Sequence, residues 1–274
     1  MLEPISVNYH LVKECNYECR FCFATFRDVR GRLTLSQKLE LLQALRESGC
    51  QKINFAGGEP NLDRDLPALL RESRKQGFTT SIISNGYGIE ALLDSSADDL
   101  DWIGLSVDSA DEEVQARLGR GRGDHVERCS ELAPLIVDAG IKLKINTVVT
   151  RLTWEEDMRP LIYTLHPHRW KVFQVLPVRG QNDRRVTPLL ISAAQFQAFV
   201  ERHKLAPPLT PVVEDNEAMT GSYAMIDPLG RFFNNIDGVH TYSRPILEVG
   251  VATALAESRF SRTRFVRRGG VYSW

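Results

Sequence analysis

Short runs in which hydrophobic and polar residues alternate recur along the first two thirds of the chain. Residues 52–56 illustrate the pattern, since Ile53 and Phe55 alternate with polar neighbours. A two-residue period places successive side chains on opposite faces of an extended strand. The pattern predicts six strands, at residues 5–11, 52–56, 80–83, 102–107, 142–149 and 171–176.

Segments with helical spacing lie between these strands, as in residues 36–47, where Leu39, Leu42 and Leu45 share one face. Further helices are predicted at residues 66–76, 112–118, 126–139 and 156–165. Strands that alternate with helices of this length pair in parallel through right-handed crossovers. Six units are too few for a closed barrel of eight. We therefore predict an α/β fold, a partial (β/α)6 barrel.

The rhythm of strands and helices breaks after residue 178. Residues 179–274 contain one clear helix, at residues 193–203, followed by a proline-rich stretch. We interpret residues 1–178 as the partial barrel and residues 179–274 as a C-terminal extension that caps the barrel and its substrate site. The two parts are expected to form one integrated domain.

Polar members of the alternating strands face the barrel interior if the apolar members pack against the helices. The residues concerned are Lys52, Asn54, Ser106, Asp108, Lys144 and Asn146. Burying such groups without a partner is unfavourable, so the pattern predicts a large, polar and anionic ligand inside the barrel. Alternatively, the lysines stand at strand starts and reach solvent along their aliphatic stems.

Charged residues nearly balance, with 34 Lys and Arg against 35 Asp and Glu in 274 residues. Such a chain is not typical of a protein that coats nucleic acid. No apolar run approaches the roughly 20 residues that span a bilayer, and the first residues lack a secretory signal pattern. We expect a cytoplasmic protein without a membrane or a stable nucleic-acid partner.

Three of the five cysteines fall within eight residues, in Cys15-Asn-Tyr-Glu-Cys19-Arg-Phe-Cys22 after the first predicted strand. In a reducing compartment such crowding indicates a metal site rather than disulfides. Thiolates are the soft ligands of iron–sulfur clusters, and three of them leave one iron of a [4Fe–4S] cluster open to a chelating cosubstrate. The alternative is a structural zinc site, with His10 as the fourth ligand.

The spacing of these cysteines, with the aromatic Phe21 before the third, resembles the signature of radical S-adenosylmethionine (SAM) enzymes. A second match is Gly57-Gly58-Glu59, where this superfamily has a turn that meets the SAM amino group. Glycines let the backbone approach a ligand, and a carboxylate suits an ammonium group. The resemblance implies further SAM contacts from Phe21, Ser84, Asn85, Ser106, Asp108, Arg120 and Gln174.

Over nearly its whole length the chain resembles the viperin family of radical SAM enzymes, in its prokaryotic type. The best-matching stretches are Asn8-Tyr-His, the cysteine motif, Lys52-Ile-Asn-Phe-Ala-Gly-Gly-Glu-Pro60, Lys144-Ile-Asn146, Arg169-Trp-Lys-Val-Phe-Gln174, Ser222-Tyr223 and Ile246-Leu-Glu-Val-Gly-Val251. The resemblance implies a 3′-deoxy-3′,4′-didehydronucleotide synthase with a [4Fe–4S] cluster and SAM. In this family a 5′-deoxyadenosyl radical removes the C4′ hydrogen of a ribonucleoside triphosphate, and the 3′-hydroxyl leaves as water. The product terminates chains made by viral polymerases, which implies an antiviral role.

The same resemblance assigns residues to the substrate. Contacts to the nucleotide are implied for Asn8, Lys52, Lys144, Asn146, Arg169 and Lys171, with the cations on its triphosphate. Guanidinium forks and ammonium groups suit phosphate oxygens. Tyr223 matches the tyrosine that delivers the final hydrogen or proton, the alternative being an ordinary tyrosine of the core or rim.

The identity of the substrate stays open at this point. CTP is the first candidate by family precedent, and UTP and GTP are alternatives. The sequence of the loops at residues 24–27 and 237–245 does not decide which base is preferred. A second interpretation is a radical SAM enzyme for a peptide or a cofactor precursor, although peptide-maturing members usually carry extra cysteines and none follows Cys129. A zinc-binding module without enzymatic activity is the third. We also expect an electron donor such as flavodoxin or ferredoxin, and a monomer.

Overall fold

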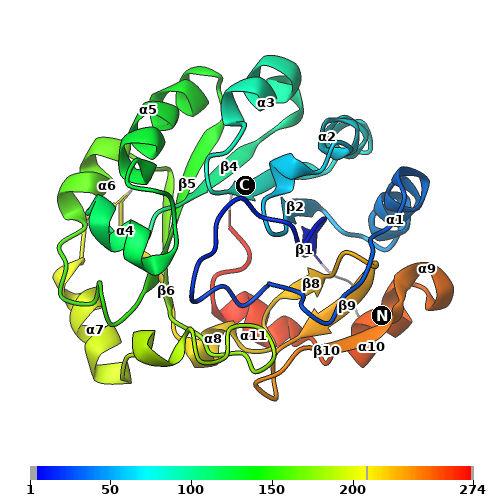
Figure 1. Cartoon of the computed structure of the whole chain (residues 1–274). Coiled ribbons are helices and arrows are strands. Elements are labelled where there is room, and N and C mark those ends of the chain that lie inside the picture. The colour runs from blue at the N-terminus through cyan, green and yellow to red at the C-terminus, as the bar shows by residue number, and fades with distance from the viewer. Residues whose placement is uncertain (1–4, 208, 273–274) are drawn as a thin grey trace.

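The computed structural model describes residues 5–207 and 209–272, in which a curved sheet is wrapped by helices on its outer side (Figure 1). Six strands pair in parallel in the order of the sequence. They are β1 (Ser6–His10), β2 (Lys52–Ala56), β3 (Thr79–Ser84), β4 (Trp102–Ser106), β5 (Lys142–Val149) and β6 (Arg169–Gln174). Helices join each of these strands to the next, and α7 (Ala193–Arg202) follows β6, so the predicted series of six β/α units is confirmed.

The connecting helices cover the outside of the sheet (Figure 1). They are α1 (Leu35–Glu47), α2 (Leu66–Lys75), α3 (Ile89–Ser96), α4 (Glu112–Leu118), α5 (His125–Asp138) and α6 (Arg159–Leu165). Helix α1 begins with a capping box, in which the Thr34 and Gln37 side chains each accept the other residue's backbone N–H. This arrangement satisfies donors that a helix start leaves without intrahelical partners.

The alternating pattern of the strands divides their side chains between core and interior. On β5, Leu143 and Ile145 belong to the hydrophobic core, whereas Lys144 and Asn146 line a cavity inside the barrel. Strand β2 repeats this division, with Ile53 and Phe55 in the core and Lys52 and Asn54 in the cavity lining. The two-residue period therefore carries polar groups into the middle of the molecule while the sheet still packs on its helices.

The C-terminal extension adds strands to both edges of the six-stranded sheet. Its elements are α7 (Ala193–Arg202), β7 (Val212–Glu214), α8 (Asn216–Met219), β8 (Ala224–Ile226), β9 (Arg231–Asn234), β10 (Thr241–Pro245), α9 (Ile246–Val249), α10 (Val251–Glu257) and α11 (Arg262–Arg267). Strand β7 pairs with β6 and β8 pairs with β1, both in parallel, and β9 and β10 continue the sheet antiparallel beyond β8. Among the described residues the sheet runs from β10 to β7 without a ladder that closes it, so the barrel is partial.

Several predicted boundaries differ from the structure. Strand β6 begins at Arg169, two residues before the predicted start, so that Arg169 itself is part of the sheet. Helix α6 begins three residues later than predicted, with Pro160 in its first turn, where a proline is well tolerated. The preceding Glu156 instead accepts hydrogen bonds from Ser109 and Ala110. The sequence did not predict strands β7 to β10. Of these, β7, β8 and β9 have only three or four residues each, too few for an alternating pattern to stand out.

Within residues 5–207 and 209–272, no helix combines the length and the apolar character that crossing a membrane requires.

Candidate functional site

Two adjoining cavities occupy the interior of the barrel. The larger, of about 520 Å³, lies toward the carboxyl ends of the parallel strands and is lined by all three motif cysteines. The smaller, of about 120 Å³, lies toward the amino ends, where Lys52 and Arg169 begin their strands. The residues that line both cavities are Asn8, Asn54, Ile83, Asn146, Phe173 and Tyr223. A ligand that enters through the larger cavity thus has a polar route into the smaller one.

The loop between β1 and α1 presents the cysteines to the larger cavity. It is tied to the end of α4, where the Arg20 N–H donates to the Leu118 carbonyl at 2.9 Å. Cys15 is exposed, and Cys19 and Cys22 are half-buried. Burial raises the pKa of the Cys19 thiol to about 12, so this thiol is protonated until a metal displaces its proton.

Two glycines let the cysteine loop lie directly against the end of β2. A Cβ atom on Gly57 would lie 2.6 Å from the Val12 carbonyl oxygen, and one on Gly58 would lie closer still to that of Glu14. The Gly58 N–H donates to the Val12 carbonyl at 2.7 Å. Both glycines line the larger cavity, so any side chain here would displace the cysteine loop.

The side chain of Glu59 is turned away from both cavities and is fully buried. Its carboxylate accepts hydrogen bonds from the Ser84 hydroxyl at 2.9 Å and from the Asn85 N–H at 2.8 Å. Burial raises the pKa of Glu59 to about 7, although these hydrogen bonds oppose the rise. Glu59 therefore positions Ser84 and Asn85, which line the larger cavity, and does not line it itself.

An ion pair with little exposure, between Arg120 and Asp108, also lines the larger cavity. The Arg120 Nε donates to Asp108 Oδ2, and Asp108 Oδ1 accepts the Val148 N–H at 2.8 Å. The Arg120 guanidinium lies 5.6 Å from the centre of the Phe21 ring. All predicted SAM contacts except Glu59 line this one cavity, namely Phe21, Gly57, Gly58, Ser84, Asn85, Ser106, Asp108, Arg120 and Gln174.

The donor set of the larger cavity fits a cluster better than a closed zinc site. Three thiols from one short loop line it, which is the soft, three-ligand set that leaves an iron open. His10, the candidate fourth zinc ligand, packs its ring against Phe26 and Phe233 at centroid distances of 5.2 and 5.4 Å. Over the described ranges, no three His, Cys, Asp or Glu side chains are gathered as a single-ion site.

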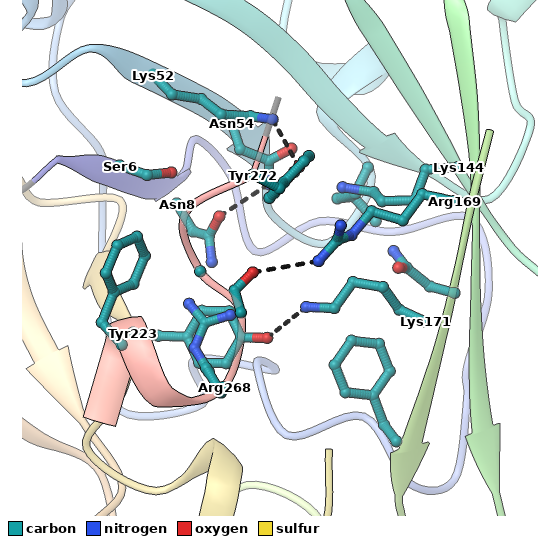
Figure 2. A pocket seen from close by; sticks show the side chains of 16 residues that line it. Ser6, Asn8, Lys52, Asn54, Lys144, Arg169, Lys171, Tyr223, Arg268 and Tyr272 are labelled. Atoms are coloured by element: carbon teal, nitrogen blue, oxygen red, sulfur yellow. Dashed lines mark hydrogen bonds between the residues drawn. The ribbon is translucent and has the colours of Figure 1, made fainter. Parts of the chain in front are cut away.

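Cationic side chains surround the smaller cavity, as Figure 2 shows. Those among the described residues are Lys52 from β2, Lys144 from β5, Arg169 and Lys171 from β6, and Arg268 just after α11. The structure therefore brings the four predicted phosphate-binding cations together. It adds Arg268, which the sequence reasoning missed.

The segment that follows α11 crosses the interior of the barrel and lines the smaller cavity (Figure 2). Lys52 Nζ donates to the Tyr272 hydroxyl at 2.8 Å, and the Arg169 guanidinium lies 3.7 Å from the centre of the Tyr272 ring. Arg169 also donates to the Gly269 carbonyl at 3.2 Å. The edge of the Tyr272 ring contacts Trp102 at the start of β4. This segment thus closes the amino end of the barrel with an aromatic ring that attracts cations.

Tyr223 lies where the two cavities meet and takes part in a buried polar cluster. Its hydroxyl donates to Glu214 Oε2 at 2.5 Å and accepts from Lys171 Nζ at 2.8 Å. Lys171 Nζ also pairs with Glu214 Oε1 at 2.6 Å. The Arg268 guanidinium lies 3.6 Å from the centre of the Tyr223 ring and 3.3 Å from Glu214 Oε1.

The electrostatics of the smaller cavity favour an anionic ligand. Burial lowers the pKa of Lys52 to about 7 and that of Lys171 to about 8, and neighbouring cations add to the effect. The pKa of Lys144 falls well below its ordinary value for the same reasons, burial first. Lys144 forms no ion pair within the part of the chain that the structure describes. An anion placed here would relieve repulsion among these groups.

Two buried polar atoms in this region have no hydrogen-bond partner among the described residues. They are Oδ1 of Asn146 and Nε of Arg169. Buried polar atoms are nearly always hydrogen-bonded, and an exception calls for a water or a ligand. Asn146 lines both cavities and Arg169 lines the smaller one, so both atoms fit contacts to a bound molecule.

Comparison with known proteins agrees with this geometry. The model of the radical SAM superfamily matches residues 9–160. An S-adenosylmethionine-dependent nucleotide dehydratase from Flammeovirga pacifica is 43% identical over 98% of this chain and 96% of its own length. One from Lacinutrix mariniflava is 40% identical over 98% of this chain, which spans 58% of that longer protein. The crystal structure of Streptococcus suis SuiB bound to S-adenosylmethionine has a TM-score of 0.67 at 18% identity, covering 84% of this chain and 60% of SuiB.

The larger cavity and its cysteine loop are thus those of a radical SAM protein. Within that superfamily, the chain belongs to the family of S-adenosylmethionine-dependent nucleotide dehydratases. Its cofactors are a [4Fe–4S] cluster and SAM, which decides between iron and zinc for the cysteine motif. The likeness to SuiB shows the fold alone.

Proposed function

We propose that this chain dehydrates a ribonucleoside triphosphate to its 3′-deoxy-3′,4′-didehydro analogue, with CTP as the first candidate and UTP or GTP as alternatives. The names of the relatives support a nucleotide substrate. The product lacks the 3′-hydroxyl that a polymerase extends, so its proposed role is antiviral chain termination.

The charge of the smaller cavity carries this proposal. Among the described residues, Glu214 is the one carboxylate that pairs with any of the cavity's five cations, so the excess over this ion-paired set is four positive charges when all are ionised. A triphosphate brings roughly four negative charges at neutral pH, more than a diphosphate or a monophosphate. The ligand that best neutralises this cavity is therefore a triphosphate.

The sugar is proposed to lie where the two cavities meet. The side chains that line both include Asn8, Asn54, Asn146 and Tyr223, which offer hydrogen bonds to hydroxyl groups. Asn54 donates to Asn8 at 3.1 Å and accepts from Ser81 at 2.8 Å, so its amide is held in one orientation. A nucleotide placed in this way directs its phosphates to the cations and its sugar toward the cysteine end of the barrel.

Cys15, Cys19 and Cys22 would hold the cluster, and the remaining lining of the larger cavity would hold SAM. When bound, the cluster and SAM would supply the radical chemistry that removes the C4′ hydrogen atom of the sugar. The chain's own residues bind the phosphates, orient the sugar through the asparagines, and place the Tyr223 hydroxyl beside it. We propose a low-potential protein such as flavodoxin or ferredoxin as the electron donor, and a monomer that acts in the reducing cytoplasm.

A competition assay tests this function. Anaerobically reconstituted protein with dithionite and SAM receives an equal mixture of the four ribonucleoside triphosphates, and products are followed by mass spectrometry. We expect 5′-deoxyadenosine together with one nucleotide product lighter than its parent by one water. The matching diphosphates and monophosphates serve as controls and should react poorly. If 5′-deoxyadenosine stays at the level without substrate for all four triphosphates, the proposed function is wrong.

A further inference from the structure

Glu214 is a buried carboxylate that neither the cysteine motif nor the predicted substrate contacts include. It ends β7, and its side chain is inaccessible to solvent. Oε1 pairs with Lys171 at 2.6 Å and with Arg268 at 3.3 Å, and Oε2 accepts the Tyr223 hydroxyl at 2.5 Å. Each oxygen of this carboxylate is thus occupied by a side chain of the smaller cavity.

In this arrangement Tyr223 donates its single hydroxyl hydrogen to Glu214 in a hydrogen bond. Lys171 Nζ donates to the same hydroxyl oxygen at 2.8 Å, so the phenol acts as acceptor toward the lysine and as donor toward the carboxylate. A tyrosine held in this way has no hydrogen to offer a sugar in the adjoining cavity. The hydroxyl hydrogen of Tyr223 becomes available to the sugar only when the Glu214 carboxylate no longer accepts it in a hydrogen bond.

Two cations keep Glu214 ionised in the ligand-free protein. Burial raises the pKa of this carboxyl, but Lys171 and Arg268 outweigh burial and hold the pKa below its ordinary value. The other charged or titratable groups facing Glu214 are Tyr223 in contact and, farther away, Lys144, Arg169 and Tyr272. The ionised state therefore depends on two side chains that also line the proposed phosphate site.

A bound triphosphate is a second anion for the same two cations. When Lys171 and Arg268 turn their N–H groups to phosphate oxygens, Glu214 loses part of its compensation and gains a negatively charged neighbour. Two anions that share one buried site raise each other's pKa, so the more buried one is the first to take up a proton. Glu214 is fully buried, whereas the phosphate enters from a cavity.

We propose that bound phosphate draws Lys171 and Arg268 away from Glu214, that Glu214 then becomes protonated, and that the Tyr223 hydroxyl hydrogen is thereby released toward the sugar. Protonated Glu214 donates its own hydrogen to the Tyr223 oxygen. The nucleotide thus prepares its own proton donor, and Tyr223 stays inactive while the smaller cavity is empty. This inference rests on the proposed function, because it takes the nucleotide phosphates to lie in the smaller cavity.

Tyr223 and Glu214 together supply the proton that the dehydration requires. As the C3′–O bond breaks, its electron pair leaves with the oxygen, which takes the Tyr223 proton and departs as water. Glu214 returns a proton to the Tyr223 oxygen and becomes a carboxylate again. The sugar, which has already lost its C4′ hydrogen atom, takes one electron from the low-potential electron-transfer protein and forms the 3′,4′ double bond. Glu214 is therefore a positioning residue and proton source that acts through Tyr223.

The first test uses the wild-type protein without SAM or reductant. Infrared difference spectra with and without CTP are recorded at pH 8 on protein carrying carboxyl-13C glutamate and on unlabelled protein. We expect CTP to produce the C=O band of one protonated carboxylic acid, which moves to lower frequency with the label. Glu59 contributes equally to both states, so it cancels in the difference.

The second test uses Glu214→Gln, with Glu217→Gln on the exposed side of α8 as the matched control. The variant removes a negative charge beside the phosphates, so we expect CTP to bind as tightly as in wild type or several-fold more tightly. Its yield of dehydrated nucleotide per 5′-deoxyadenosine should fall at least tenfold, and the infrared band should be absent. A residue with a merely structural role would instead weaken CTP binding when replaced.

The outcomes separate this inference from the proposed function. CTP is replaced by UTP or GTP if the competition assay selects one of them. If none of the four ribonucleoside triphosphates binds to the wild-type protein, the proposed function fails and this inference falls with it. If CTP binds but no carboxylic acid band appears, the inference alone is refuted. It is also refuted if Glu214→Gln keeps the wild-type product yield per 5′-deoxyadenosine. Should that variant not fold, the wild-type spectra still decide.

Discussion

Replacing Lys144 by methionine tests the phosphate site with a change that keeps the volume and apolar stem of the side chain. Lys144 lies between Lys52 and the two cations of β6, and its own environment disfavours the ammonium form. A hydrogen bond to a charged group contributes about 1.5–3 kcal/mol, and every 1.4 kcal/mol is about tenfold in a dissociation constant. We expect Lys144→Met to weaken CTP binding by about 10- to 100-fold.

The stability of the ligand-free protein should change in the opposite direction. A buried cation that lacks an ion pair destabilises the fold, so Lys144→Met should raise the melting temperature or leave it unchanged. Opposite effects on stability and affinity distinguish a binding residue from one that supports the fold.

Equilibrium binding of CTP to cluster-loaded protein, measured calorimetrically at physiological ionic strength, is the assay. Lys142→Met is the control, because Lys142 begins the same strand, lies over the Trp102 ring and does not line the cavity. Iron content and SAM binding should be equal in all three proteins. Equal CTP affinity in wild type and Lys144→Met would refute the assignment of the smaller cavity to phosphates.

Three further predictions concern pH, the glycine pair and the cluster. CTP affinity should fall as the pH rises from about 7 to 9. Burial lowers the pKa of Lys52 to about 7 and that of Lys171 to about 8, so each ammonium group loses its charge as the pH passes its pKa. An affinity that rises with pH would contradict this prediction. Gly58→Ala should prevent the cysteine loop from docking and lower the iron content after reconstitution several-fold, as measured by metal analysis. Cys19→Ala should abolish the brown iron–sulfur absorbance and SAM cleavage, whereas Cys129→Ala, in the buried core, should keep both.

Local patterns were enough to predict the barrel and the cluster loop. The cysteine motif and the glycine pair are contiguous in sequence, and their chemistry is encoded by spacing alone. Alternation on β2 and β5 identified Lys52 and Lys144 as interior cations, because a strand with one apolar face must send the other face inward. Arg169 was assigned only through family resemblance, since the predicted strand began two residues after it.

The rest of the candidate site depends on contacts between distant parts of the chain. Arg268 and Tyr272 reach the smaller cavity from the last residues of the sequence, and no local period indicates that this segment folds back into the barrel. Glu214 lies on a three-residue strand whose place beside β6 is fixed by pairing, not by its own pattern. Arg268 stands in a run of basic residues near the C-terminus, and such runs are usually solvated, so the run by itself does not indicate a binding site.

The pairing of β8 with β1 has a consequence for how the protein is made. Strand β1 leaves the ribosome before the other strands of the sheet, yet one of its two neighbours, at residues 224–226, is synthesised more than 200 residues later. Until then β1 presents an unpaired edge, which is a template for wrong association. Biosynthesis at roughly 5–20 residues per second leaves this edge open for at least ten seconds. The late pairing of β1 with β8 therefore makes the nascent chain, rather than the finished molecule, the form most in need of chaperones.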